Sequence, residues 1–92
     1  MGWYLYLIEC TDGSIYTGIT VDVEKRYAAH AAGKGGRYTR SHRPVRLLAV
    51  FPHADRATAS RAEYATKRLS AAAKRALARS AAQGNADGGK VR

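Results

Sequence analysis

Residues 3–18 read WYLYLIECTDGSIYTG, which is two apolar runs on either side of a short polar segment. The first run, residues 3–10, is continuous and rich in aromatic and branched side chains, which is typical of a strand covered on both faces. The segment TDG predicts a turn, and residues 14–20 predict the returning strand. Because the first strand is apolar throughout, the hairpin predicts a sheet in which that strand is central.

The length of the turn decides whether Tyr6 and Tyr16 lie on the same face of the hairpin. A two-residue loop would send the two phenols to opposite faces. A three-residue loop, with Gly13 in the left-handed region, places Tyr16 opposite Ile8, diagonal to Tyr6. In that register Gly18 lies opposite Tyr6. We therefore predict a three-residue loop, a positive φ at Gly13 and both phenols on one face.

The next segments predict a helix, a loop and a third strand. Asp22, or alternatively Thr20, can cap a helix over residues 22–32. The glycine-rich, basic segment GKGGRYTRSHRP, residues 33–44, predicts a loop. VRLLAVF, residues 45–51, predicts the third strand, bounded by two prolines. The apolar face expected on the helix consists of Val23, Tyr27 and Ala31.

The last third of the chain predicts helices. From Asp55, an N-cap, the pattern is helical to about Gln83, and a break near Ser70 predicts two helices. Beyond that point there is little apolar content, so we expect one domain over residues 1–83 and a disordered tail over residues 84–92. The apolar stripe expected along these helices consists of Ala62, Ala65, Leu69, Ala72, Ala73, Ala76 and Leu77.

The predicted element order is β-β-α-β-α-α. A hairpin followed by a helical crossover returns the third strand to the free edge of the first strand, which gives the sheet order 2-1-3. The predicted fold class is therefore α/β, with a small three-stranded antiparallel or mixed sheet flanked by helices.

The charge of the chain indicates nucleic acid as a partner. Sixteen Lys and Arg against seven Asp and Glu give a formal net charge of +9 and a pI near 10.2. Residues 1–22 carry no Lys or Arg, whereas residues 25–46 and 56–79 hold seven each, so the basic surface belongs to the elements after the hairpin. The alternative is a basic, alanine-rich chain that rests on ribosomes or anionic membranes without specificity.

Length and cysteine content indicate the number of domains and the cellular compartment. Ninety-two residues form one domain, near the lower size for folding without disulfides or a structural metal. The single Cys10 excludes an intramolecular disulfide, and with no charged-then-apolar leader it indicates a reducing, cytoplasmic setting. No apolar run is long enough to span a membrane, and we expect a monomer.

Further polar residues stand out after the hairpin. Taken alone, its two tyrosines are ordinary strand formers. Arg26 and His30 are four apart and project from one face of the first helix, directly after the second strand. Glu63 has Lys67 at i+4, a spacing that usually makes a surface salt bridge. The combination of these residues in this order is more specific than any one of them.

In order and spacing, these residues resemble the GIY-YIG nuclease domain, found in UvrC-type excision nucleases, some homing endonucleases and many small single-domain bacterial proteins. Tyr4-Leu5-Tyr6 stands where the family has its first tripeptide, and Tyr16-Thr17-Gly18 where it has its second. Arg26 and Glu63 follow in the family's order. The chain is similar to the small single-domain branch over residues 3 to about 80.

The resemblance implies a metal-dependent endonuclease that hydrolyses phosphodiester bonds in DNA. Glu63 would hold Mg²⁺ or Mn²⁺, because Mg²⁺ keeps several waters and often takes only one or two protein carboxylates. Arg26 would hold the phosphate by its fixed fork of donors. Tyr6 or Tyr16 would be the general base, and both assignments stay open. Larger members carry an asparagine after the glutamate helix, whereas the only asparagine here is Asn85.

The basic loop supplies the expected nucleic-acid contacts. Its backbone donors and cations would meet phosphates while Tyr38 stacks on a base, and a solvated, disordered loop in the free protein is an equal alternative. The three histidines lack metal-ligand spacing, which argues against a zinc site, and we expect them to be solvated or phosphate-facing. The expected nucleic-acid-binding residues are Gly18, His30, Lys34, Arg37, Tyr38, Arg40 and Lys67.

The sequence therefore predicts an endonuclease that prefers branched, nicked or otherwise non-duplex DNA, with DNA favoured over RNA. The chain contains no recognisable element for reading a long base sequence, so recognition of shape is expected. The alternative is a non-catalytic nucleic-acid or ribosome-associated binding protein that retains the fold.

Overall fold

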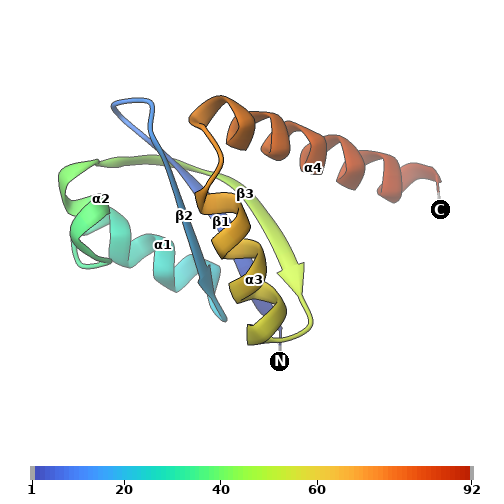
Figure 1. The fold of residues 1–92 in the computed structure, drawn as a ribbon, viewed down its shortest axis with the longest axis horizontal. Coiled ribbons are helices and arrows are strands. Elements are labelled where there is room, and N and C mark those ends of the chain that lie inside the picture. Colours follow the sequence, from blue (N-terminus) through green and yellow to red (C-terminus); the bar gives the residue numbers. More distant parts are fainter. Residues whose placement is uncertain (1, 92) are drawn as a thin grey trace.

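The computed structural model describes the backbone of residues 2–91 and the side chains of residues 2–81. Figure 1 shows a small sheet with helices on both faces. The elements in chain order are β1 (Trp3–Cys10), β2 (Ile15–Thr20), α1 (Val23–Ala31), α2 (Arg37–Ser41), β3 (Pro44–His53), α3 (Arg56–Lys67) and α4 (Ala71–Val91).

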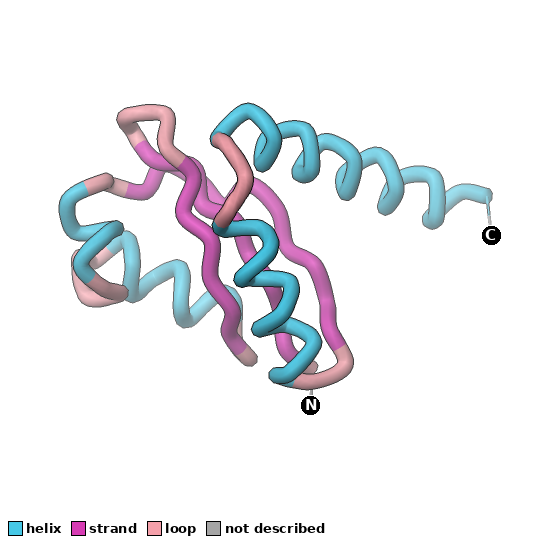
Figure 2. The backbone as a smooth tube through the Cα atoms, in the orientation of Figure 1, coloured by secondary structure: helices cyan, strands magenta, loops and turns pink. Residues whose placement is uncertain are grey.

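The sheet is antiparallel with the order β2-β1-β3, so the predicted order and the central first strand are confirmed. α1 and α2 lie on one face of the sheet, and α3 crosses the opposite face (Figures 1 and 2). Successive side chains of β1 therefore enter two layers. One layer contains Tyr6, Ile8 and Cys10 with Tyr27 of α1, and the other contains Leu7 and Ile15 with Ala78 of α4.

Polar side chains mark the starts of the long helices. The carboxylates of Asp22 and Asp55 accept hydrogen bonds from backbone amides in the first turns of α1 and α3, at 3.1 and 2.8 Å. Such caps satisfy amides that have no partner within the helix. The predicted break near Ser70 is confirmed, because Ser70 Oγ accepts from the amide of Ala73 at 3.1 Å where α4 begins.

The segment 33–44, expected to be a loop, contains the short helix α2. Gly36, with a φ of 138°, precedes the helix, and the amide of His42 donates to the carbonyl of Tyr38 at 2.8 Å. Thr39 in the middle of α2 is buried. A five-residue helix is unstable by itself, so only its packing against α1 produces it. Sequence pattern gives no signal for such an element.

The expected apolar faces of the helices were wrong at several positions. On α1, Ala31 is exposed, whereas His30 is buried. The helix pattern failed because alanine is found on both faces of these helices, so periodicity did not identify the packed side. The buried positions of α3 and α4 are Ala59, Thr66, Lys74 and Ala78, whereas Ala65, Leu69, Ala72 and Ala76 of the expected stripe are exposed.

Two further expectations concern a membrane span and the C-terminal residues. Among the described residues, no helix combines the length and the apolar character that crossing a membrane requires. The side chains after Ala81 lie outside the described residues. The disordered tail expected over residues 84–92, and with it the boundary at residue 83, therefore stays a prediction.

Candidate active site

The turn between β1 and β2 brings the two tyrosines to one face of the sheet. Gly13 has a φ of 86°, and its amide donates to the carbonyl of Cys10 at 3.0 Å. The amide of Cys10 in turn donates to the carbonyl of Ser14 at 2.9 Å. This geometry confirms the predicted three-residue loop. Because the register follows from it, Tyr6 and Tyr16 both point toward α1.

Gly18 lies opposite Tyr6 and makes room for its ring. A Cβ atom on Gly18 would lie 2.5 Å from Cζ of Tyr6, closer than carbon atoms pack. The rings of Tyr6 and Tyr16 are 6.2 Å apart between centroids. Tyr6 is only 2% exposed, whereas Tyr16 is half-buried. Tyr16 is therefore the more accessible of the two phenols.

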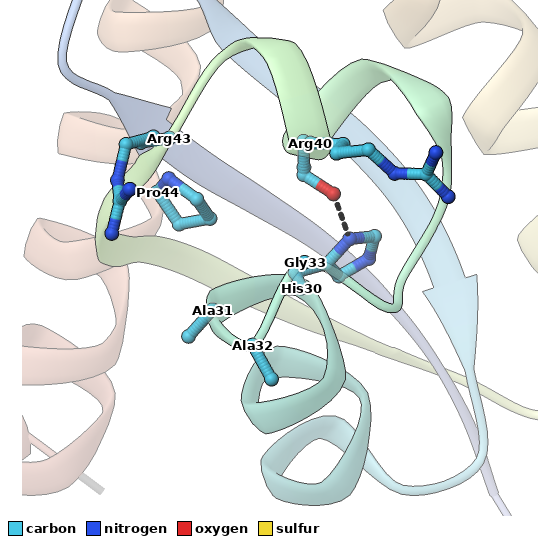
Figure 3. Close-up of a pocket in the computed structure, with 8 residues that line it drawn as sticks. His30, Ala31, Ala32, Gly33, Arg40, Arg43 and Pro44 are labelled. Carbon is cyan, nitrogen blue, oxygen red and sulfur yellow. Dashed lines mark hydrogen bonds between the residues drawn. The ribbon is translucent and has the colours of Figure 1, made fainter.

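His30 is the centre of a buried chain of hydrogen bonds. Its Nε2 lies 2.9 Å from the hydroxyl of Tyr6, and its Nδ1 lies 2.6 Å from Thr39 Oγ1, the bond drawn as a dashed line in Figure 3. Burial, and after it the charge of Arg26, lower the pKa of His30, so the ring is neutral at neutral pH. A neutral imidazole donates from one nitrogen and accepts at the other. The chain thus connects the hydroxyl of Tyr6 to α2.

The expectation that His30 is solvated or phosphate-facing is wrong, because this side chain is 1% exposed. The segment after α1 packs directly on it. A Cβ atom on Gly35 would lie 2.6 Å from Cγ and 2.8 Å from Cα of His30, so only glycine fits at this position. In this structure His30 therefore acts on its buried neighbours Tyr6 and Thr39, and it offers no atom to solvent.

Arg26 and Glu63 place opposite charges around Tyr6. Burial is the main cause that raises the pKa of Tyr6 to about 12; the nearby guanidinium group of Arg26 opposes the rise, and the charges of Tyr16 and Glu63 add to it. Nη2 of Arg26 also donates to the carbonyl of Gly35 at 2.8 Å. The structure therefore brings both tyrosines and Arg26 together. Glu63 lies on α3, and among the described residues its ion pair is with Lys67.

Glu63 is the candidate metal ligand. Its side chain is 24% exposed, and its Oε2 lies 3.3 Å from Nζ of Lys67, the ion pair expected from the i+4 spacing. In the described part of the chain, no three His, Cys, Asp or Glu side chains gather as a metal-binding group. A single carboxylate fits Mg²⁺, which completes its shell with water and phosphate oxygens. It does not fit a closed zinc site.

Tyr38 extends the aromatic cluster from Tyr16 to the surface. The centroids of these two rings are 5.5 Å apart, and Tyr38 is 38% exposed. Tyr38 stacks on His42, with 4.2 Å between centroids and 20° between planes. His42 Nδ1 lies 2.5 Å from Asp12 Oδ2 in the β1–β2 turn. The sequence did not reveal this contact, because only the fold brings the turn beside α2.

Most of the described cations are exposed, Arg26 and Arg75 are half-buried, and one lysine is buried. Lys74, which the sequence analysis missed, is 8% exposed, and its Nζ donates to the carbonyl of Ile15 at 3.1 Å. A lysine in an alanine-rich helix carries no signal of burial, so only packing reveals it. The expected phosphate-contacting residues Lys34, Arg37, Arg40 and Lys67 are all exposed.

Known proteins share this sequence and fold. The family model for the GIY-YIG catalytic domain matches residues 2–76. A UPF0213 protein of Cupriavidus pinatubonensis is 58% identical over 72 residues, which cover 78% of this chain and 80% of that protein. A UPF0213 protein of Xanthomonas axonopodis pv. citri is 57% identical over 72 residues, 78% of this chain and 71% of that protein. The solution NMR structure of a UPF0213 protein from Bacillus halodurans is similar with a TM-score of 0.52 and 47% identity, covering 84% of this chain and 82% of that chain.

Proposed function

Because the chain belongs to the GIY-YIG catalytic domain family, as one of the small bacterial UPF0213 proteins, we propose that it is a metal-dependent endonuclease that hydrolyses phosphodiester bonds in DNA. The observation that carries the proposal is the convergence of both tyrosines and Arg26 beside Gly18. Hydrolysis of a phosphodiester needs an activated water and neutralisation of charge on the phosphate. The residues of this cluster supply groups for both tasks.

Arg26 is the phosphate-binding residue of the proposal. One of its terminal nitrogens is held by the carbonyl of Gly35 at 2.8 Å, which fixes the direction of the guanidinium group. A guanidinium has five N–H donors, so others are left for phosphate oxygens. Because Gly35 also packs on His30, the same short segment orients both side chains.

We assign the two tyrosines different roles. Tyr6 is buried, and with a pKa raised to about 12 its phenol stays protonated at neutral pH, so its role is to hold the cluster together through His30. Tyr16 is half-exposed and lines a surface pocket, which makes it the phenol that contacts the attacking water. Proton transfer by a positioned side chain contributes about two to four orders of magnitude in rate.

Glu63 would hold the divalent metal. When bound, a metal neutralises charge on the phosphate and acidifies the attacking water. Glu63 supplies one carboxylate for this purpose, and Lys67 lies 3.3 Å from it. The exposed cations Lys34, Arg37 and Arg40 are suited to phosphates rather than to base edges, which supports selectivity for the shape of the nucleic acid.

The test is incubation of the purified protein with branched, nicked, single-stranded and duplex DNAs and matching RNAs, with Mg²⁺ or Mn²⁺ and with chelator. We expect cleavage of a non-duplex DNA that chelator abolishes. Glu63→Gln should abolish cleavage yet leave binding nearly intact, because removing a negative charge does not reduce attraction to phosphate. Glu24→Gln, which removes an exposed carboxylate from the first turn of α1, is the matched control and should cleave as the wild type does.

The tyrosine variants separate the two assigned roles. Tyr16→Phe should lower the cleavage rate by about two to four orders of magnitude and leave the melting temperature unchanged. Tyr6→Phe should lower the free energy of unfolding as well, because it leaves a buried nitrogen of His30 without its partner. Equal rates for Tyr16→Phe and wild type would contradict the assignment.

A non-catalytic nucleic-acid or ribosome-associated binding protein is the second candidate. The observation that favours it is the ion pair between Glu63 and Lys67, which engages the single carboxylate of the site. Binding to DNA without metal-dependent cleavage of any substrate in the panel, or undiminished cleavage by Glu63→Gln, would support this candidate and overturn the endonuclease.

A further inference from the structure

A pocket lies beside the tyrosine cluster, along the free edge of the sheet. β2 is the outer strand in the order β2-β1-β3, so one of its edges has no neighbouring strand in the described part of the chain. The pocket therefore connects Tyr16 of the candidate active site with the exposed ring of Tyr38. Its lining consists of Ile15, Tyr16, Thr17, Tyr38, Lys67 and Lys74.

Lys74 is a buried cation that has no acidic partner among the described residues. It is 8% exposed, and the described residues provide its ammonium group with one hydrogen bond, to the carbonyl of Ile15, and no carboxylate. An ammonium group has three donors, and buried charges in proteins are normally paired. Burial, followed by the charge of Lys67, lowers the pKa of Lys74. Lys67, which lines the same pocket, is paired with Glu63, whereas an anion in the pocket would give Lys74 a partner.

Thr17, which lines the same pocket, has an unpartnered polar group. The residue is 2% exposed, and its Oγ1 has no hydrogen-bond partner among the described residues. A buried hydroxyl without a partner destabilises the fold, so native proteins rarely keep one unless water or a ligand binds it. The hydroxyl is enclosed by protein on the face of the sheet opposite to Tyr16, so the group that the pocket offers to a ligand is the ammonium group of Lys74.

Tyr38 provides a fixed aromatic surface at the mouth of this pocket. One side of its ring stacks on His42, which the carboxylate of Asp12 holds in place. Tyr38 nevertheless remains 38% exposed. A ring that is held on one side and exposed elsewhere is suited to stacking on a nucleobase.

We propose that this pocket binds a phosphate group of an unpaired nucleotide through Lys67 and Lys74, while the base of that nucleotide stacks on Tyr38. The inference rests on the proposed function, because Tyr16 belongs to both sites. Only an unpaired nucleotide fits, since a base inside a duplex is already stacked on its neighbours and cannot lie on a side chain. The substrate class is accordingly nucleic acid with a single-stranded segment next to the cleavage site.

The pocket between α1 and α2 does not compete for this role. It contains Arg40 and Arg43, but their guanidinium groups lie on opposite sides of it and do not converge (Figure 3). Two of the polar groups in its wall, on His30 and Thr39, already bond to each other. The edge of β2 is therefore the better phosphate site.

The experiment measures binding in the presence of chelator, so that no cleavage occurs. The probes are a fluorescently labelled single-stranded oligothymidylate and a blunt-ended duplex of two annealed DNA strands with the same number of phosphates. Tyr38→Ala and Lys74→Met should each weaken binding of the oligothymidylate about tenfold and affect the duplex less. Lys74→Met should also reduce the salt dependence of single-strand binding by about 0.7 in the slope of log K against log salt.

Two matched variants serve as controls. Lys25→Met removes an exposed cation from α1, and Tyr64→Ala removes an exposed ring from α3, both outside the pocket. Both should bind either probe as the wild type does. Since Lys74→Met removes a buried hydrogen bond, its folding is checked by thermal melting. An NMR titration of the wild type with the oligothymidylate needs no variant, and the largest amide shifts should fall on Tyr16, Thr17 and Tyr38.

Wild-type affinity of Tyr38→Ala for the oligothymidylate, or amide shifts that avoid these three residues, would overturn the proposal. An equal loss of affinity for the duplex would also overturn it, because the pocket would then not select unpaired nucleotides. Failure of the endonuclease is a separate result. If the wild type cleaves no substrate but Tyr38→Ala and Lys74→Met show the expected losses of affinity, the pocket is supported and the endonuclease is not. If the wild type cleaves DNA but these variants bind as it does, the endonuclease is supported and the pocket is not.

Discussion

A tight steric constraint in the site lies between Gly18 and Tyr6. The ring of Tyr6 occupies the space where a side chain at position 18 would stand, at 2.5 Å from a Cβ atom to Cζ. Tyr6 is buried there and bonded to His30, so its ring has no free direction in which to move. The glycine is required for its lack of a side chain and not for a special φ, since its φ is not positive.

Gly18→Ala should therefore destabilise the protein and disturb the site. We expect the free energy of unfolding in urea to fall by about 1–3 kcal/mol, because overpacking forces the ring or the backbone to shift. Gly2→Ala is the matched control, since a Cβ there would lie 3.7 Å from the nearest atom, an ordinary contact. Equal stability of the two variants would show that Tyr6 does not occupy this position.

His30 predicts a pH dependence of stability. Its pKa is lowered by burial and by Arg26, so the folded protein resists protonation that the unfolded chain accepts at a pKa of about 6.5. The contribution of His30 to the free energy of unfolding is complete above that pH. It is lost as the pH falls through the lowered pKa of His30 in the folded state. The free energy of unfolding of the wild type should thus decrease from about pH 7 toward pH 5.

His30→Gln isolates this contribution, because it removes the titrating ring while the other ionisable groups remain. Urea denaturation at a series of pH values should give a smaller decrease for the variant than for the wild type. The acidic groups with lowered pKa values, among them Glu9 and Asp55, act in a more acidic range and do not interfere. Parallel pH profiles would exclude His30 as the source of the decrease.

Among the helices, α2 depends most on a single tertiary contact. It has five residues, too few to be stable alone, and no side chain caps its start. Thr39 anchors it by the 2.6 Å bond to His30 Nδ1. Because α2 also carries Tyr38, this bond positions the ring that lies beside Tyr16.

Thr39→Val should loosen α2, since the isosteric change keeps the volume and removes the hydroxyl. We expect a loss of about 1–3 kcal/mol in the free energy of unfolding, because a buried nitrogen of His30 is left without a partner. Hydrogen exchange of the α2 amides should accelerate. Thr39→Ser retains the hydroxyl, so its free energy of unfolding should fall less than that of Thr39→Val. If the two variants have the same stability and the same hydrogen exchange, the bond to His30 does not anchor the helix.

The distribution of charge over the protein predicts how it meets nucleic acid. The net charge of +9 lies on the elements after the hairpin, and many of these cations are exposed. Affinity for DNA should therefore fall steeply with salt, by roughly two orders of magnitude between about 50 and 200 mM if about four phosphates are contacted. Titration of labelled DNA at several salt concentrations measures this slope, and a flat response would remove nucleic acid as the partner.

The sheet and the hairpin could be predicted from the sequence because they depend on local chemistry. The continuous apolar run of β1 required burial on both faces and so a central position. The left-handed glycine, Gly13, set the loop length, and side-chain alternation then placed Tyr6, Tyr16 and Gly18 relative to one another. Polar caps at Asp22 and Asp55 likewise marked helix starts from neighbouring residues alone.

The sequence by itself thus determined the sheet order, the turn and the face of the two phenols, whereas only the tertiary structure decided which polar groups are buried and what they contact. His30, Thr39 and Lys74 look solvated in the sequence, and all three are buried by elements distant along the chain. Whether a residue is buried, and which group it bonds to, depends on the part of the fold that packs over it. In alanine-rich helices the sequence pattern does not show which side is packed. The buried chain from Tyr6 to α2 and the cationic pocket at β2 follow from packing alone.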